Sequence, residues 1–188
     1  SKLAAAITTK TSKENPVIVD VGANVGLFTK AFMKAPKTPK KIIAIEPSLY
    51  VFSILLKITA NMPLVCCRKV ALSHETATVD LKTPLKKSGS LRVGLSHIGN
   101  VDDQKVFRET VVAKRLDDVL NDENIHQVDI VKLDVEGAEE QVIAGAPNLF
   151  HNVRPIWFVE LVQGRTDNFS GSAEKIFSKF IAAGYEAF

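Results

Sequence analysis

Acidic residues within or at the end of apolar runs are the residues of this chain best suited to chemistry. Asp20 is the fourth residue of the run VIVDV, and the turn that follows has the pattern G-x-N-x-G, formed by Gly22, Asn24 and Gly26. Glu46 ends the next apolar run, KIIAIE, twenty residues after Gly26. A carboxylate at such a place can accept hydrogen bonds from both hydroxyls of a ribose. The pattern therefore predicts a nucleotide-type cofactor.

The glycine turn distinguishes between two classes of such cofactors. A dinucleotide fingerprint needs three glycines as G-x-G-x-x-G, and the corresponding positions here hold Gly22, Asn24 and Leu27. Asp20 would repel a pyrophosphate, but it suits a ligand that carries an ammonium group and a sulfonium. S-adenosylmethionine (SAM) has both, and its carboxylate can lie against helix amides beyond Gly26. We predict SAM as the cofactor and keep a nicotinamide dinucleotide as the alternative.

A second group of acids follows later apolar runs. Asp134 and Glu136 come after VDIVKL, and Glu160 ends the next run. Ligands of open α/β sheets bind beyond the carboxyl ends of the strands. If the acceptor of a methyl group from SAM is a hydroxyl, it must lose its proton, and a positioned base contributes about 10²–10⁴-fold. We predict Glu136 as the base and Asp134 as the organiser of the site, with Lys132 as the charge partner of Asp134.

Two other readings of these acids stay open. Glu136 and Glu139 also suit the first turn of a helix, where acids are favoured by the helix dipole. Asp134 and Glu160 could hold a divalent ion, but no local spacing is typical of metal ligands, so we predict no metal site. His97, in a long Gly/Ser-containing segment, is a third candidate catalytic residue.

The elements that must position these residues alternate along the chain. Continuous apolar runs predict buried parallel strands, at Val17–Val21, Lys41–Glu46, Leu64–Leu72, Val128–Val135 and Pro155–Val162. Amphipathic patterns with start and stop residues predict helices, at Val25–Met33, Ser48–Asn61, Ala138–Phe150 and Ser172–Gly184. This alternation predicts an α/β fold with a doubly wound, mostly parallel, Rossmann-like sheet and flanking helices. In the last helix we expect Ile176, Phe177, Phe180 and Ile181 to face inward.

The middle of the chain breaks this alternation. Two strand-like segments without a helix between them predict an extra β-hairpin, at Thr76–Lys82 and Val106–Lys114. The connecting loop, residues 83–104, has no periodicity, and we expect a mobile loop that covers the substrate. The whole chain is expected to form one domain, preceded by an N-terminal segment at residues 1–15.

Composition narrows the classes of partner. The net charge is +3 with basic residues spread along the sequence, which does not favour nucleic-acid binding. The two cysteines, Cys66 and Cys67, are adjacent and are expected to be reduced, as in a cytosolic protein. No apolar stretch approaches the roughly 20 residues that span a bilayer, and the first apolar run is too short for a signal peptide. We expect a cytoplasmic protein with a small-molecule partner.

Five segments together resemble one known family. VDVGANVGLFT, IIAIEPS, KVALS, RLDDVL and VDIVKLDVEGAEEQVIAGA stand in the order and spacing of the FkbM-type methyltransferases, a branch of the class I SAM-dependent methyltransferases. The likeness runs from about Val17 to Glu160, and KLDVEGAE is its most distinctive piece. It implies SAM as cofactor, S-adenosylhomocysteine as product, and O-methylation of hydroxyls on sugars and natural products.

The resemblance also implies which residues touch the cofactor. These are Asp20, Gly22, Asn24, Gly26 and Glu46, with the backbone near Val70 and Ala71 for the adenine. Class I folds close with an antiparallel strand pair, and this sequence stops at GYEAF where such a strand would begin, so we expect that strand to be incomplete. Two alternatives remain, an NAD-linked oxidoreductase of similar fold and a SAM-binding partner domain without catalysis.

Overall fold

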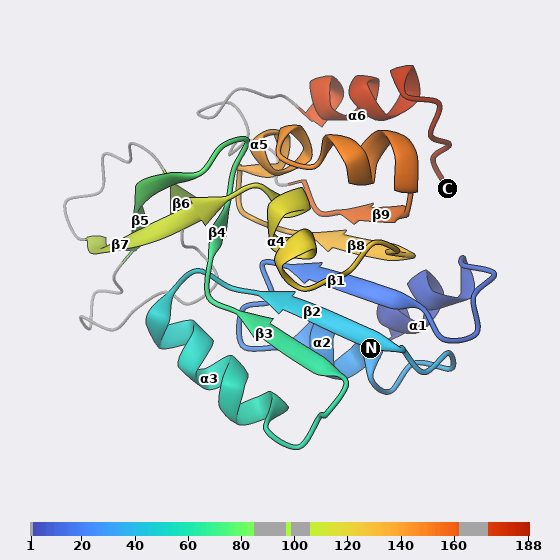
Figure 1. Cartoon of the computed structure of the whole chain (residues 1–188), viewed down its shortest axis with the longest axis horizontal. Helices are drawn as coiled ribbons and strands as arrows, with labels where there is room; N and C mark the ends of the chain where they lie inside the picture. Colours follow the sequence, from blue (N-terminus) through green and yellow to red (C-terminus); the bar gives the residue numbers. More distant parts are fainter. Residues whose placement is uncertain (1, 85–96, 99–105, 162–172) are drawn as a thin grey trace.

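A five-stranded parallel sheet forms the centre of the molecule (Figure 1). The computed structural model describes residues 2–84, 97–98, 106–161 and 173–188. The strands lie in the order β3 (Val65–Arg68), β2 (Lys41–Ile45), β1 (Val17–Val21), β8 (Ile130–Leu133) and β9 (Ile156–Val159). The chain leaves β1 toward β2 and β3 and later resumes on its other side at β8, so the order reverses between β1 and β8. Such a reversal is where open α/β sheets bind ligands.

Helices cover both faces of this sheet, as predicted. Alternate strand residues point to opposite faces: Ile18 and Ile42 belong to one buried cluster, whereas Val19 and Ile43 belong to another. The first face is covered by α1 (Lys2–Thr9), α2 (Leu27–Phe32) and α3 (Leu49–Thr59). The second is covered by α4 (Leu116–Asp122), α5 (Glu139–Ala144), the π-helix η1 (Leu149–Val153) and α6 (Ala173–Ala182). The prediction of a doubly wound fold is confirmed.

A second, smaller sheet lies beside the carboxyl ends of the main strands (Figure 1). Its order is β4 (Ala71–Leu72), β7 (Val106–Lys114), β5 (Ala77–Pro84) and β6 (His97–Ile98). The antiparallel pair β5–β7 is the predicted hairpin. Its inner side chains, among them Leu81 and Val111, form a small buried cluster with Ala71 and Ala113.

Two sequence predictions about elements were wrong, and the bounds of a third element differ in part. Leu64–Leu72 is not one strand, because β3 ends at Arg68 and β4 pairs with β7 in the other sheet. The helix predicted over 138–150 ends at Ala144, where Gly145 and Pro147 interrupt it. The predicted loop 83–104 begins inside β5 and contains β6, and its remaining residues lie outside the described part of the chain. Helices α1 and α4 were not predicted.

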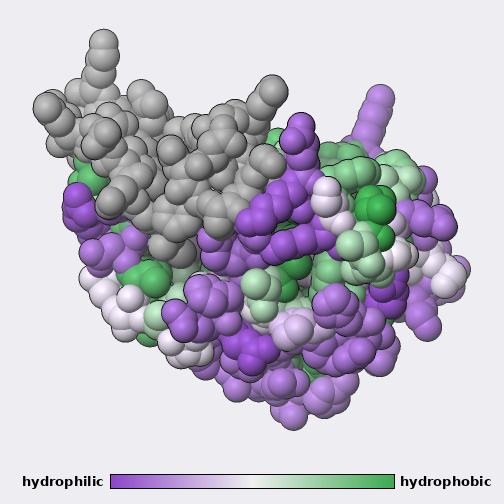
Figure 2. Space-filling view, turned by 90° about the horizontal axis from the view of Figure 1, so that it is seen from above, coloured by the Kyte–Doolittle hydropathy of each residue, from purple (hydrophilic) through white to green (hydrophobic). Residues whose placement is uncertain are grey.

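The last helix only partly matches its predicted orientation. Ile176 is buried, but Phe177 and Ile181 are about half exposed. They line a groove beside β9. Figure 2, which looks onto the α6 side, shows apolar atoms among polar ones on this side of the molecule. Gly184 ends the helix as predicted, with its N–H bonded to the carbonyl of Ile181. Among the described helices, none has the length and apolar character that crossing a membrane requires.

The turn after β1 generates a stability prediction. Gly22 has a φ of +70°, and a Cβ there would lie 1.8 Å from the carbonyl oxygen of Asp134. We expect Gly22→Ala to lower the free energy of unfolding by about 3 kcal/mol or more, because the left-handed backbone and the overlap both oppose a methyl group. The measurement is urea denaturation.

Gly184 supplies the matched control. Its φ is +75°, but the nearest atom to an added Cβ is Arg154 Nη2 at 3.8 Å. Gly184→Ala should therefore lose only about 1 kcal/mol, the cost of the backbone conformation alone. Equal losses in the two variants would show that the contact between Gly22 and Asp134 contributes nothing.

Candidate functional site

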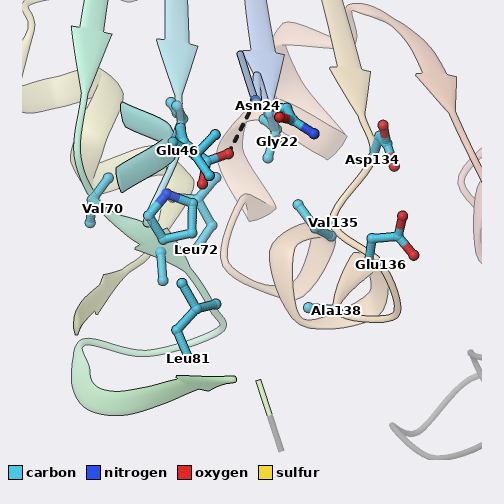
Figure 3. Close-up of a pocket in the computed structure, with 15 residues that line it drawn as sticks. Gly22, Asn24, Glu46, Val70, Leu72, Leu81, Asp134, Val135, Glu136 and Ala138 are labelled. Carbon is cyan, nitrogen blue, oxygen red and sulfur yellow. Dashed lines mark hydrogen bonds between the residues drawn. The ribbon is translucent and has the colours of Figure 1, made fainter. Parts of the chain in front are cut away.

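A pocket opens at the carboxyl ends of β1, β2 and β8 (Figure 3). Glu46 lies on one side of it, and Asp134 and Glu136 lie on the other, with their carboxylates directed away from Glu46. Val135 lies between the two acidic sides. Its walls combine apolar side chains with a few polar groups, as the walls of sites for small molecules and cofactors do.

Glu46 is a buried carboxylate on the wall of this pocket. Its Oε2 accepts the N–H of Asn24 at 3.1 Å and its Oε1 accepts the N–H of Ser48 at 3.0 Å. Burial raises the pKa of Glu46 to about 7, although these two hydrogen bonds favour the charged form. Each carboxylate oxygen keeps a further lone pair. Glu46 can therefore accept hydrogen bonds from two hydroxyls of a ligand.

The glycine turn serves two separate purposes. Gly22 and Asn24 line the pocket, and the N–H of Gly22 donates to the carbonyl of Ile45 at the end of β2. Asn24 has a φ of +52°, and its side-chain oxygen accepts the N–H of Val25. Gly26 does not line the pocket. A Cβ at Gly26 would lie 2.8 Å from a methyl group of Leu55, so this glycine lets α2 approach α3.

Asp20 lies beneath the pocket rather than in its wall. It is fully buried, and its Oδ2 accepts the hydroxyl of Thr29 in α2 at 2.6 Å. Its Oδ1 lies 3.6 Å from the ammonium of Lys132, which is 2% exposed. The sequence analysis expected Asp20 to face the ammonium and sulfonium of a ligand, and in the structure its side chain contacts Thr29 and Lys132 on the α2 face of the sheet.

The Lys132 ammonium joins several parts of the site. It donates to the carbonyl of Gly22 at 3.0 Å and to Asp134 Oδ2 at 3.1 Å. Burial raises the pKa of Asp20, and the attraction of Lys132 opposes that rise. The predicted pairing of Lys132 with Asp134 is present, and the same ammonium also approaches Asp20, which the sequence analysis did not predict.

Glu136 occupies an unusual backbone position. It has a φ of +55°, and Gly137 follows with a φ of +106°. A non-glycine residue in the left-handed region carries strain, and such residues cluster at functional sites. The alternative role at the start of α5 belongs to Glu139, whose Oε1 accepts the N–H of Gly137 at 3.0 Å.

Apolar side chains form the part of the wall near Glu46. The predicted residues Val70 and Ala71 line the pocket, together with Leu72 and Leu81, which the sequence analysis missed. Leu81 comes from β5 of the second sheet, so no local pattern could have assigned it to this pocket. A flat aromatic ring would fit against such a wall.

Two other sequence candidates are not placed in the pocket. Glu160 follows β9 and is exposed, and it does not line the pocket. His97 belongs to the short strand β6, where its backbone pairs with Lys82, but its side chain lies outside the described part of the structure.

Comparison with known proteins identifies the family. The model described as the Methyltransferase FkbM domain matches residues 20–187. The chain belongs to the FkbM methyltransferase family. This membership confirms the resemblance on which the sequence analysis relied, and it extends the likeness beyond Glu160 to α6.

Individual relatives of this FkbM chain have modest identity. Methyltransferase sdnD of Sordaria araneosa is 30% identical over 157 residues, which cover 70% of this chain and 60% of sdnD. The 2-O-methyltransferase NoeI of Sinorhizobium fredii is 26% identical over 158 residues, 77% of this chain and 63% of NoeI. The chain thus spans about three fifths of the length of these two relatives.

A solved structure shares the fold. The crystal structure of the methyltransferase FkbM from Methylobacillus flagellatus superposes with a TM-score of 0.64 at 14% sequence identity. The match covers 90% of this chain and 38% of that chain. It confirms the class I methyltransferase fold expected from the sequence.

The buried pair of Asp20 and Lys132 leads to a prediction about stability. We expect Lys132→Met to lower the free energy of unfolding by about 3–5 kcal/mol at neutral pH, because it leaves the carboxylate of Asp20 buried without a cation. Without Lys132 the pKa of Asp20 rises further above 3.8, so folding takes up a proton. The loss of stability in Lys132→Met, relative to the wild type, should therefore become smaller as the pH falls below the raised pKa of Asp20 toward 3.8, the ordinary value for an aspartate.

Urea denaturation at several pH values measures this effect. The control is the double variant Asp20→Asn/Lys132→Met, in which the charge is absent and part of the stability should return at neutral pH. A deficit that is the same at every pH, and the same in the double variant, would mean that Lys132 acts through packing alone.

Proposed function

We propose that this protein is a SAM-dependent methyltransferase that transfers a methyl group to a hydroxyl of a small molecule, of the sugar or natural-product type. The observation that carries the proposal is the pocket itself, with Glu46 at one end and Asp134 and Glu136 at the other. Family membership supports methyl transfer. The printed name of NoeI, a 2-O-methyltransferase, favours oxygen as the accepting atom.

The residues of the pocket fit the adenosyl part of SAM. Glu46 would accept the two ribose hydroxyls on the lone pairs that Asn24 and Ser48 leave available. The adenine would lie along the backbone of Val70 and Ala71, against the apolar side chains of Leu72 and Leu81. When bound, SAM supplies a methyl group on a positively charged sulfur, which leaves as the neutral thioether of S-adenosylhomocysteine.

The acids at the opposite end would serve the acceptor. We assign Glu136 as the base that takes the proton of the attacking hydroxyl. Asp134 would organise the site, because its carboxylate is bonded to Lys132 and is only partly exposed. The left-handed backbone of Glu136 fixes the place from which its side chain extends. Orientation of two bound reactants contributes about 7–11 kcal/mol to such reactions, and the base adds less.

Fewer observations bear on the cellular compartment, the acceptor and the domain organisation of the proposed enzyme. Both thiols, Cys66 and Cys67, are free and half-buried in β3, which agrees with a reducing compartment such as the cytoplasm. We propose a small-molecule acceptor and a single SAM-binding domain. A SAM-binding partner domain without catalysis is the second candidate, and the experiments below distinguish it.

Glu46 generates a prediction about pH. Because its pKa is about 7, the carboxylate is only half ionised at neutral pH, and the ionised form is the better acceptor for ribose hydroxyls. Affinity for adenosine should therefore rise up to about tenfold per pH unit below 7 and level off above about 8. Adenosine is the probe because it has no group that titrates in this range. Calorimetry in two buffers should also detect proton release at pH 7.

Glu46→Gln is the matched control for this measurement. It keeps the shape of the side chain and removes the titration, so its affinity should be low and independent of pH. A wild-type affinity that does not change between pH 5.5 and 8.5, about 1.5 units on either side of the pKa, would show that Glu46 does not hold the ribose.

The proposed base is tested by single-turnover chemistry. The acceptor is first found by incubating the protein with labelled SAM and fractionated extracts, followed by mass spectrometry of the products. Glu136→Gln should then keep its SAM affinity and lose about 10²–10⁴-fold in rate at saturating SAM and acceptor. Glu160→Gln, at the end of the neighbouring strand, is the control and should react at the normal rate.

Other outcomes of this experiment also have a defined meaning. A normal rate in Glu136→Gln removes this carboxylate from the mechanism and turns attention to Asp134 and His97. SAM binding without labelled product in any fraction favours the non-catalytic partner domain. No SAM binding at all contradicts the proposed function.

A further inference from the structure

The charge of this chain is distributed unevenly. Residues 1–70 contain eleven basic and three acidic residues, whereas residues 71–188 contain thirteen basic and eighteen acidic ones. Two of the three early acids, Asp20 and Glu46, are buried in the site described above. Only Glu14 is left to offset the basic residues on the surface formed by the first part of the chain.

The fold gathers many of these basic residues at one edge. Residues 10–16 and 33–41 are distant in sequence but lie side by side before β1 and β2 (Figure 1). Three hydrogen bonds join them, donated by Lys37 Nζ to Thr11 O, by Asn15 Nδ2 to Thr38 O and by Lys40 N to Pro16 O. We call this surface the lysine edge, and its members are Lys10, Lys13, Lys34, Lys37, Lys40 and Lys41.

The lysine edge is not neutralised by its own surroundings. Four of the six lysines are exposed, and within the described residues no carboxylate lies at salt-bridge distance from any of them. Glu14, within the same segment, is exposed, and the charge of Lys41 is among the causes that lower the pKa of Glu123. A positive surface of this kind attracts an extended negative one.

We propose that the lysine edge docks the protein onto an anionic lipid bilayer. Its basic residues are all lysines, and the first arginine of the chain is Arg68, so the forked donors that read nucleic-acid bases are absent from it. Neither the pocket nor the groove beside β9 has these lysines in its walls. Clustered lysines on a surface without a cleft match the diffuse negative charge of lipid headgroups.

An exposed aromatic ring at the same edge supports a bilayer as the partner. The Phe188 side chain is 77% exposed, and the ammonium of Lys10 lies 4.3 Å from the centre of its ring. An apolar ring beside a lysine suits the boundary between headgroups and lipid chains. The lysine edge adjoins the amino ends of β1 and β2, whereas the pocket lies at their carboxyl ends, so docking leaves the pocket open.

Sedimentation with lipid vesicles tests this inference independently of methyl transfer. The chain should bind vesicles of phosphatidylcholine with roughly one-third phosphatidylserine and not vesicles of phosphatidylcholine alone. Binding should be lost at about 1 M salt, where the Debye length is about 3 Å. The triple variant Lys13→Gln/Lys34→Gln/Lys40→Gln should bind the anionic vesicles about 100-fold more weakly.

Two controls show whether charge at the lysine edge is responsible. The charge-keeping variant Lys13→Arg/Lys34→Arg/Lys40→Arg should bind anionic vesicles as the wild type does, and adenosine affinity should be the same in all three proteins. Absence of vesicle binding, equal binding to neutral vesicles, or binding to duplex DNA in place of vesicles would each overturn the proposal. None of these outcomes bears on the proposed methyltransferase activity.

Discussion

The ammonium group of Lys132 connects the parts of the molecule that must stay in register for a site to exist. It lies between the ends of β1 and β8, where it approaches Asp20 on the first strand and Asp134 beyond the second. Its hydrogen bond to the carbonyl of Gly22 extends this connection to the turn that lines the pocket. Through Asp20 and Thr29 the same group of contacts reaches α2. A buried charge of this kind tolerates little displacement, because each partner that moves away leaves an unpaired charge behind.

The arrangement places Glu46 and Asp134, two of the three carboxylates that line the pocket, in different electrical settings. Glu46 is held by backbone amides and is buried enough that its pKa rises to about 7. Asp134 is more exposed, and its Oδ2 lies 3.1 Å from the ammonium of Lys132. One end of the pocket is thus suited to receive hydroxyl hydrogens, and the other holds an ion pair. This difference gives a bound molecule a preferred direction.

The sheet could be predicted from the sequence because buried parallel strands have a strong local pattern. Asp20 shows the limit of that reasoning, since its place near the end of an apolar run indicated an acid close to a ligand. A signal for the actual partner was present in the sequence. Asp20 and Lys132 are each the second-last residue of a strand, and the two strands pair so that these residues are neighbours. Leu81 and the lysine edge could not be predicted, because they depend on how distant segments meet. The break between β3 and β4 was missed for the same reason.

The position of Leu81 has a consequence for how the fold responds to a ligand. One side of the pocket belongs to the main sheet and another to the small sheet, which is joined to the rest of the domain through β4 and the start of α4. A molecule that fills the pocket touches both sheets and so adds its binding free energy to the contact between them. By linkage, the free energy that ligand binding adds to the contact between the sheets equals the binding free energy that the ligand loses when this contact is broken. Substitutions on the far side of β5 and β7 can therefore alter affinity without touching the bound molecule.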